Sequence, residues 1–272
     1  LAKRASTDCF MSTSDELKQR LKNAAAADGG EFLMALLVSE VIDPEIDRVD
    51  LQRHFAALIA PLEERMPVDV DCLLGFFREV GFGNQRPGAV DLSHSNLQWV
   101  LAQRQGLPIT VASVLIEAAR RCGIAAHGIN YPGHFLVSIE GRVADPLSLR
   151  RLQKQEFEAK LSAEEVQDVL RPTPTSVFGL RMLNNVKIQY AQAQNWSGAL
   201  DILECQLAVE TIDETAQAAL HFERGECLLQ MEQPLQAQQA YTICLQMSPP
   251  PTLAQQAERR LEQLQWQPRT LH

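Results

Sequence analysis

Three polar residues between positions 108 and 146 have the order that acyl-transfer chemistry requires. Thr110 lies near the start of an expected helix, His134 begins an expected strand, and Asp145 ends another. In cysteine hydrolases and acyl transferases, a nucleophile at a helix N-terminus is activated by the helix field, a His on a neighbouring strand takes its proton, and an Asp orients that His. His134 and Asp145 are placed for the last two roles, and Thr110 is a candidate for the first.

Each of these residues also has an ordinary structural interpretation. His134 can be a half-buried residue at a strand end whose ring is satisfied by Asp145, and Asp145 can be a turn residue before Pro146. Thr110 is common at a helix start, and a threonine nucleophile needs a strong base. His127 precedes His134 by a short interval, but no third ligand is evident. We therefore expect no metal site and no cofactor.

Helices precede these residues along the chain. Apolar residues recur at helical spacing, and Pro61 is expected to kink or interrupt one helix because its ring blocks a backbone hydrogen bond. Residues 81–91 are rich in Gly, Pro and Asn and form a loop. The expected helices span 13–27, 31–42, 49–65, 69–80 and 93–104.

The candidate residues themselves follow in a helix and short strands. The helix begins at Pro108, a favoured first-turn residue, and ends at Gly123, a favoured helix terminator. After Gly123 the helical spacing of apolar residues gives way to the alternating pattern of strands, with a tight turn expected at 140–141. Residues 150–170 are polar and helical, with a capping box at 162–165. The expected strands span 125–130, 134–139 and 142–144.

The C-terminal part lacks any strand signal, so Pro172 and Pro174 mark a domain boundary. One stretch matches the small, large, small, aromatic and proline positions of a tetratricopeptide repeat, and a looser copy precedes it. Ordinary helical packing is the alternative explanation. The matching residues are Gly225, Leu228, Ala237, Tyr241 and Pro249, and in the looser copy Val186, Tyr190, Trp196, Ala199 and Leu203. Two repeats need a neighbour to cover their apolar face, either the first domain or a partner, and the functional interpretation is a docking surface for a protein segment.

Composition limits the remaining possibilities. The chain has 272 residues, of which 22% are charged and 46% apolar, as is usual for folded proteins of one or two domains. The net charge of −9 opposes binding to nucleic acid, and no apolar run is long enough to span a membrane. The cysteines contain no CxxC pair and are expected to be buried free thiols. Without a secretory signal, a cytoplasmic location follows.

The stretch from Gly106 to Pro146 resembles the core of the transglutaminase-like superfamily. In that superfamily a Gly-x-Cys opens a helix of this length, a Gly-Ile break and a His strand follow, and an Asp strand ends the motif. Counting back from Gly123 and Ile124 places the expected cysteine at Pro108, which has no thiol. The resemblance therefore implies a lost nucleophile, with Thr110 as the nearest replacement.

The wider chain resembles the bacterial SirB family, in which such a domain precedes tetratricopeptide repeats. The resemblance rests on Asp43-Pro44, GFGN at 81–84, Ser95 to Leu97, GLPI at 106–109 and NYPGHF at 130–135. This chain has His94-Ser95-Asn96 where the family pattern is closer to Asn-Ser. The family label is regulator of invasion-gene transcription. If the chain is a non-catalytic binding protein, any effect on transcription would act through a protein and not through DNA.

These observations give one prediction of fold and two of function. The fold is expected to be α+β, with a flexible lead at 1–12, a papain/transglutaminase-like domain of helices and a small antiparallel sheet at 13–172, and an all-α tetratricopeptide domain at 175–272. We expect a non-catalytic scaffold or regulatory protein of undetermined oligomeric state. The alternative is a residual hydrolase or acyl transferase using Thr110, His134 and Asp145. Candidate binding residues are Asn96, Asn130, Tyr131, Tyr190, Trp196 and Tyr241.

Overall fold

The computed structural model describes residues 15–65, 67–84, 90–158, 162–209 and 213–265. Within these ranges the chain divides into two compact units, one of residues 21–189 and one that comprises 190–265 together with 15–20. The division falls after Gln189, inside helix α9 (Thr175–Gln192), and not at Pro172 and Pro174 as the composition suggested. The expected lead at 1–12 lies outside the described residues.

Helix α9 joins the first unit because its first half is part of that unit's core. Phe178 is buried and its ring lies 5.4 Å from that of Phe135. Gly179 packs so closely on Met34 that a Cβ there would lie 2.7 Å from the methionine sulfur. The two prolines thus precede a helix of the first unit and do not separate the units.

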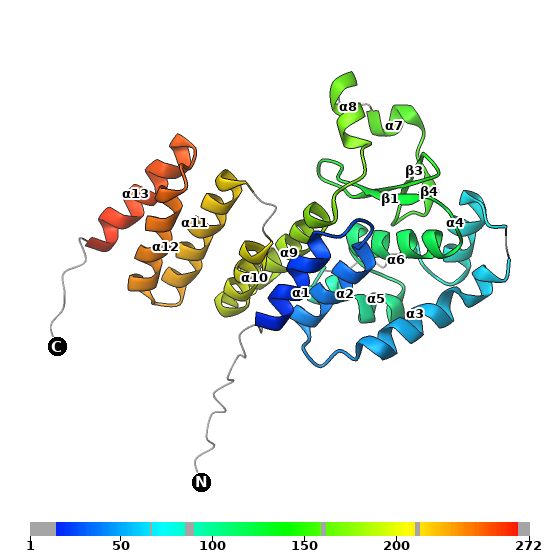
Figure 1. Cartoon of the computed structure of the whole chain (residues 1–272), viewed down its shortest axis with the longest axis horizontal. Coiled ribbons are helices and arrows are strands. Elements are labelled where there is room, and N and C mark those ends of the chain that lie inside the picture. Colours follow the sequence, from blue (N-terminus) through cyan, green and yellow to red (C-terminus); the bar gives the residue numbers. More distant parts are fainter. Residues whose placement is uncertain (1–14, 66, 85–89, 159–161, 210–212, 266–272) are drawn as a thin grey trace, which may run out of the picture. The chain divides into compact units, whose positions relative to one another are not determined.

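The helices of the first unit agree with the apolar periodicity, with two corrections (Figure 1). The third helix continues through Pro61, whose side chain is exposed. The expected helix over 93–104 is two elements, because Asn96 has an extended backbone and caps the second one. The helices before the sheet are α1 (Asp15–Ala25), α2 (Glu31–Ile42), α3 (Arg48–Glu63), α4 (Val70–Glu79), the 3-10 helix η1 (Leu92–Ser95), α5 (Leu97–Gln103) and α6 (Pro108–Arg121).

Four antiparallel strands form a sheet in sequence order, β1-β2-β3-β4. His134 lies before the second strand, not at its first residue as expected. The last strand was not foreseen, since residues 150–151 have a helical pattern. Pairing with β3 decides their conformation, and the Leu152 amide continues it by donating to the Val143 carbonyl at 2.9 Å. The strands are β1 (Ala126–Ile129), β2 (Leu136–Ile139), β3 (Arg142–Asp145) and β4 (Arg150–Arg151).

Helix α6 is the centre of the first unit and covers one face of the sheet. All residues from Ile109 to Ile116 are buried. A Cβ at Gly128 of β1 would lie 3.8 Å from Ile116 and 2.6 Å from the Phe135 ring, so glycine permits this close packing. Helices α2 and α5 also pack against α6. Arg120 ties these elements together, because its guanidinium bonds the Glu31 carboxylate on α2 and the Ala126 carbonyl on β1.

The opposite face of the sheet is covered by the segment between the sheet and α9. The apolar cluster on this face contains Ile129, Leu136 and Val143, with Leu152 and Leu170 packed against it. This segment forms α7 (Lys154–Glu158) and α8 (Ala163–Val169). The predicted capping box is confirmed, since Ser162 and Glu165 bond each other's backbone amides.

The second unit is helical, as predicted. Its elements are the first residues of α1, the last residues of α9, α10 (Trp196–Ala208), α11 (Glu214–Gln230), α12 (Pro234–Gln246) and α13 (Pro251–Gln265). Helices that follow one another in sequence pack together. The free thiols Cys122, Cys205, Cys227 and Cys244 are buried as predicted, Cys72 is half-buried, and Cys9 lies outside the described residues.

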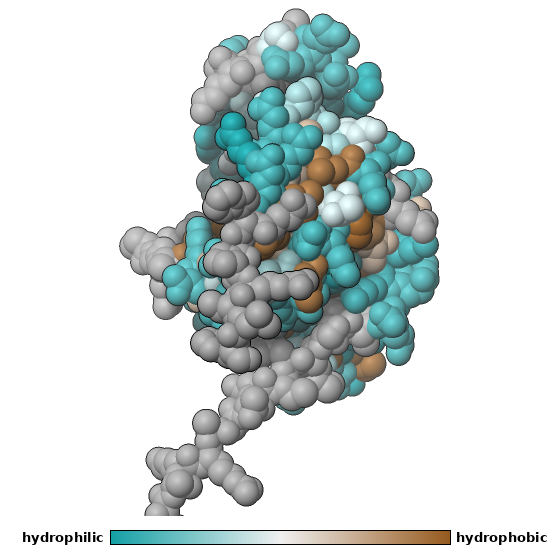
Figure 2. All heavy atoms as spheres, turned by 90° about the vertical axis from the view of Figure 1, so that its left-hand side faces the viewer, coloured by the Kyte–Doolittle hydropathy of each residue, from teal (hydrophilic) through white to brown (hydrophobic). Residues whose placement is uncertain are grey.

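The surface of the described chain is mainly polar. Most of the residues that are coloured in Figure 2 are hydrophilic, with small apolar patches between them. Large exposed apolar side chains come from several elements, including Val49 on α3 and Leu235 on α12. Among the helices that the structure describes, none combines the length and apolar character needed to cross a membrane.

Candidate functional site

The structure brings His134 and Asp145 together at the end of strand β3. His134 Nε2 lies 3.5 Å from Asp145 Oδ1, and the two side chains are 34% and 23% exposed. The same Asp145 oxygen accepts hydrogen bonds from the amides of Leu147 at 2.7 Å and Ser148 at 3.4 Å. Asp145 is therefore both a turn residue and the partner of the imidazole, which combines the two interpretations drawn from the sequence.

The charge of Asp145 is favoured by these contacts. Burial by itself raises the pKa of the Asp145 carboxyl, but the hydrogen bonds from His134 and Leu147 more than offset it. The net pKa lies below the ordinary value. An ionised carboxylate in this position can orient the His134 ring or neutralise its protonated form.

Thr110 does not complete the expected triad. Its side chain is fully buried in α6, and among the described residues its hydroxyl has no hydrogen-bond partner. Pro108, where the nucleophile is expected, occupies the first turn of the same helix. Proline provides neither a thiol nor a backbone N–H. The structure thus pairs His134 with Asp145, but the described residues at the start of α6 include neither a cysteine nor an exposed hydroxyl group.

The loop that carries His134 is fixed by an arginine that the sequence analysis did not identify. Arg181 on α9 donates to the Asn130 side-chain oxygen, to the Tyr131 carbonyl at 3.1 Å and to the His134 carbonyl at 2.8 Å. Its guanidinium also lies 5.5 Å from the centre of the Phe135 ring. The only available signal in the sequence was a lone arginine among apolar residues of a helix.

Arg181 keeps its charge in this half-buried position. Burial lowers the pKa of its guanidinium, but arginine starts from so high a value that it stays protonated. Three acceptors from one loop match the planar donor geometry of the guanidinium. The loop from Asn130 to His134 is therefore held from outside the sheet.

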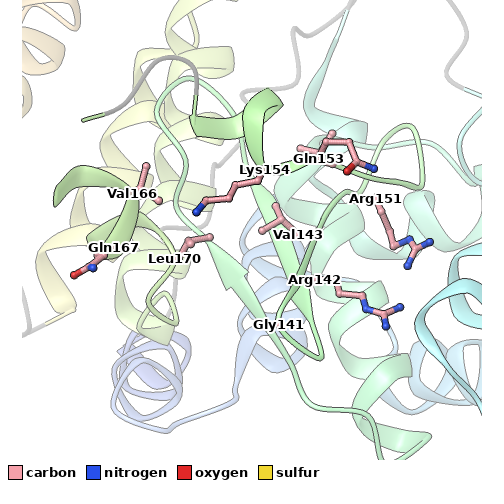
Figure 3. Close-up of a pocket in the computed structure, with 10 residues that line it drawn as sticks. Gly141, Arg142, Val143, Arg151, Gln153, Lys154, Val166, Gln167 and Leu170 are labelled. Atoms are coloured by element: carbon pink, nitrogen blue, oxygen red, sulfur yellow. The ribbon is translucent and has the colours of Figure 1, made fainter. Parts of the chain in front are cut away.

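A pocket of about 570 Å³ lies on the sheet face that α8 borders. Apolar side chains of β3 and α8 line it, and the Lys154 ammonium lies between them (Figure 3). Alternation along β3 places Val143, a lining residue, on the same face as Asp145. The pocket and the His134–Asp145 pair thus share one side of the sheet, but neither His134 nor Asp145 lines the pocket.

The candidate binding residues of the first unit have structural contacts. The Asn96 side chain accepts the amide protons of Gln98 and Trp99 and caps α5. Asn130 accepts from Arg181. Tyr131 packs on the apolar cluster beneath α8. Ligand binding by these residues stays a prediction.

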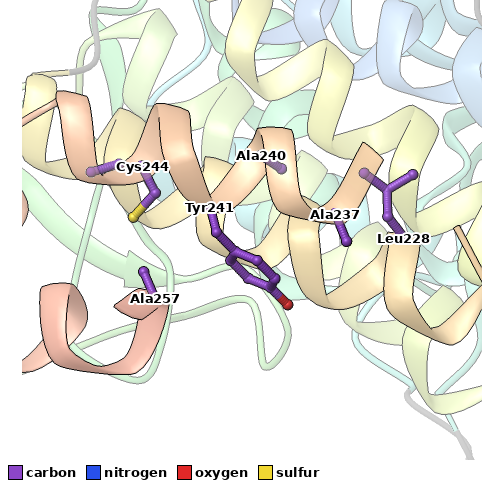
Figure 4. Close-up of a cluster of buried hydrophobic side chains, with 7 residues drawn as sticks. Leu228, Ala237, Ala240, Tyr241, Cys244 and Ala257 are labelled. Carbon is purple, nitrogen blue, oxygen red and sulfur yellow. The ribbon is translucent and has the colours of Figure 1, made fainter. Parts of the chain in front are cut away.

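The candidate binding residues of the second unit are largely packing residues. Tyr241 is completely buried, so it presents no surface to a partner, and this part of the prediction needs correction. Figure 4 shows its ring in the cluster where α11, α12 and α13 meet. Its hydroxyl donates to Glu226. Tyr190 and Trp196 are half-buried and pack against Ala199 and Leu203. A role for these two residues in binding stays a prediction.

A bound metal ion needs clustered His, Cys, Asp or Glu side chains. Across the described ranges, no group of three or more His, Cys, Asp or Glu side chains is arranged to hold one. His127 lies on β1, and its Nε2 is buried without a hydrogen-bond partner among the described residues.

Comparison with known proteins identifies the first unit. The model of the Transglutaminase-like superfamily matches residues 48–184, half of the chain. The chain belongs to the transglutaminase-like superfamily. The match contains Pro108, His134, Asp145 and Arg181, so the His–Asp pair and its supporting loop lie within the transglutaminase-like domain. No solved structure shows a significant match to the chain.

Several bacterial relatives of this transglutaminase-like protein carry the name UPF0162 protein. One from Xylella fastidiosa is 28% identical over 187 residues, which cover 64% of this chain and 65% of the relative. One from Vibrio cholerae is 27% identical over 123 residues, 42% of this chain and 45% of the relative. One from Pseudomonas aeruginosa is 37% identical over 82 residues, 29% and 30%. The chain thus covers less than two thirds of the length of these relatives.

Proposed function

We propose that this chain is a non-catalytic binding protein, in which a degenerate transglutaminase-like domain accompanies a helical docking region of tetratricopeptide type. The main observation in support of this proposal is the burial of Thr110. Acyl transfer requires a nucleophile that can reach both the substrate and the base. The Thr110 side chain is 0% exposed, and Pro108 has no nucleophilic atom.

The helical unit supports a role in docking. Close contacts occur where the repeat pattern requires small residues, since a Cβ at Gly225 would lie 2.5 Å from the Tyr241 ring. Acidic side chains predominate on these helices, and two of their arginines, Arg224 and Arg260, already pair with Glu204 and Glu226. A protein segment with positive charge complements this surface better than nucleic acid does. A cytoplasmic location and a role in transcription remain predictions.

The alternative is a residual hydrolase or acyl transferase. It has one observation in its favour, the contact between His134 and Asp145. That contact could activate a nucleophile only if Thr110 became accessible. The burial of the Thr110 hydroxyl therefore places this alternative second.

A substrate panel separates the two functions. The full chain is assayed against activated esters, thioesters and amides, beside His134→Ala and Thr110→Val. The binding proposal expects all three proteins to give the same background rate. A wild-type rate at least about tenfold above both variants would reject it, because only a working base and nucleophile give such a difference.

Peptide display tests the docking region. Linear peptides are selected on the full chain and then measured against Glu258→Lys/Glu262→Lys, a pair of exposed residues one turn apart on α13. Selected peptides should be rich in Lys and Arg and lose about tenfold in affinity for this variant. The matched control, Glu45→Lys/Glu64→Lys, alters exposed residues of the first unit and should bind normally. Failure to select any peptide, or equal losses in both variants, would contradict the docking role.

A further inference from the structure

The pocket between the sheet and α8 has apolar walls on two sides. Val143 and Leu152 form its sheet side, and Val166 and Leu170 form its helix side. Three of these residues, Val143, Leu152 and Leu170, also belong to the apolar cluster on this face of the sheet. The volume of about 570 Å³ lies within the range of roughly 300 to 1,000 Å³ that is usual for small-molecule sites. The pocket has room and walls for an apolar chain.

One cationic group lies among these walls. Figure 3 shows the Lys154 side chain extending from the start of α7 toward the space between Leu170 and Val143. Gln153 and Gln167 are polar lining residues without charge. A lysine ammonium has three donors, so it can bond an anionic group of a ligand as well as a group of the protein. This chemistry favours an anion at the end of the apolar chain.

Two glutamates next to the lining residues in sequence, Glu156 and Glu165, bond other groups of the protein. Glu156 accepts from Arg150 at 2.9 Å and from the Gln153 amide at 2.7 Å. Glu165 accepts from the Ser162 amide at 2.7 Å. These hydrogen bonds lower the pKa of both glutamates, because the nearby donors stabilise the ionised carboxylates. A ligand anion near Lys154 therefore meets carboxylates whose charge is already partly compensated.

The two arginines that line the pocket add positive charge from farther away. Arg142 and Arg151 alternate with Val143 and Leu152, so their guanidinium groups extend to the other side of the sheet (Figure 3). Arg151 pairs there with Asp71 at 3.1 Å. Among the described lining residues there are lysine and arginine side chains but no carboxylate. The described lining thus contains basic residues and no acidic ones, in a chain whose net charge is −9.

We propose that this pocket binds a carboxylate that carries an apolar chain. The apolar chain lies between β3 and α8, and the carboxylate bonds Lys154. A fatty acid and the C-terminus of a peptide that ends in a large apolar residue share this chemistry. The site goes beyond the proposed docking function, because it uses neither the helices of the second unit nor His134.

Titration calorimetry of the full chain with three eight-carbon probes tests the proposal. Octanoate, octan-1-ol and octylammonium share one chain and differ in charge. Octanoate should bind with saturation and at least about tenfold more tightly than either of the others, which corresponds to one charge-assisted contact. Equal affinity for octanoate and octylammonium, or no saturable binding of octanoate, would overturn the proposal.

Variants locate the site. Lys154→Gln should lower octanoate affinity about tenfold and leave octan-1-ol binding unchanged, because only the charged contact is lost. Leu170→Ala should weaken both probes. Lys22→Gln on α1 is the matched control and should change neither. If Lys154→Gln binds octanoate as the wild type does, the pocket is not the site.

A comparison of peptides distinguishes the two natural sources of such a carboxylate, a fatty acid and a peptide C-terminus. Hexapeptides that end in leucine are compared with a free or an amidated C-terminus. A free peptide that binds more tightly than octanoate identifies a peptide C-terminus as the ligand, and weaker binding identifies a fatty acid. Amidation should abolish binding in either case. An amidated peptide that binds as well as the free one refutes the carboxylate requirement, whatever the outcome for the docking region.

Discussion

The Arg181 guanidinium donates a hydrogen bond of 2.8 Å to the main-chain carbonyl of His134. Helix α9 thereby fixes the residue that the sequence marked as a base, although Arg181 and His134 are far apart in the chain. The same guanidinium bonds two further groups of the loop, on Asn130 and Tyr131. The position of the imidazole therefore depends on a contact that strand pairing does not supply.

Replacing Arg181 should loosen this loop. Arg181→Met removes all three hydrogen bonds and is expected to lower the free energy of unfolding by about 2 to 3 kcal/mol, because loop acceptors lose a charged donor. The His134 ring signals in NMR spectra should shift and broaden. Arg181→Lys should recover part of both effects. Arg53→Met, at an exposed surface pair, is the control and should cost less than about 0.5 kcal/mol. Unchanged ring signals in Arg181→Met would contradict the positioning role.

Thr110→Val should stabilise the protein. The buried Thr110 hydroxyl has no partner within the described part of the chain, and such a group costs about 1 to 3 kcal/mol. We expect the free energy of unfolding in urea to rise by about 1 kcal/mol. Ser113→Ala, one turn later, should lower it by about 1 kcal/mol, because the Ser113 hydroxyl donates to the Thr110 carbonyl at 2.7 Å. Destabilisation by Thr110→Val would show that its hydroxyl has a partner.

Gly225→Ala should destabilise the second unit. The added Cβ would lie 2.5 Å from the ring of Tyr241, which is fully buried and cannot move aside freely. We expect a loss of about 1 to 3 kcal/mol, measured by thermal and urea unfolding. Gly75→Ala is the matched helical control, since its nearest neighbour atom is 4.0 Å away. That variant should gain about 0.5 to 1 kcal/mol from helix propensity. Similar effects at both glycines would disprove the close contact.

Ionisation of Asp145 should make the free energy of unfolding depend on pH in the acidic range. Because the pKa of Asp145 is lowered in the folded chain, its ionised form favours folding at pH values above its unfolded pKa of about 3.9. That contribution is lost as the pH falls through the lower, folded pKa. The difference in unfolding free energy between wild type and Asp145→Asn should therefore be largest at pH 5 and shrink toward pH 2.

The control for this experiment is Asp71→Asn, an exposed carboxylate paired with Arg151. Its difference from wild type should be small at every pH, because solvent screens an exposed pair. A gap between wild type and Asp145→Asn that widens toward pH 2 would mean that Asp145 is destabilised in its charged form.

Local patterns in the sequence were enough to predict most elements. Helix α2 spans the predicted residues, and the starts of α6 and α8 follow from Pro108 and the Ser162 capping box. These features act within a few residues, so a single sequence contains them. The resemblance of residues 106–146 to the transglutaminase-like core implied the fold class, and the family match confirms it.

Tertiary contacts decided what the local patterns could not. Residues 150–151 have a helical pattern, but pairing with β3 makes them a strand, since a ladder partner outweighs a weak propensity. The unit boundary moved to Gln189 because the apolar face of α9 packs on the core of the first unit.

The sequence by itself determined that a His and an Asp accompany a helix that begins without a cysteine. Only the tertiary structure decided that Thr110 is buried, that Tyr241 is a core residue, and that Arg181 holds the His134 loop. Burial and long-range hydrogen bonds depend on which elements meet in space. Residue type and spacing along one chain do not specify these tertiary contacts.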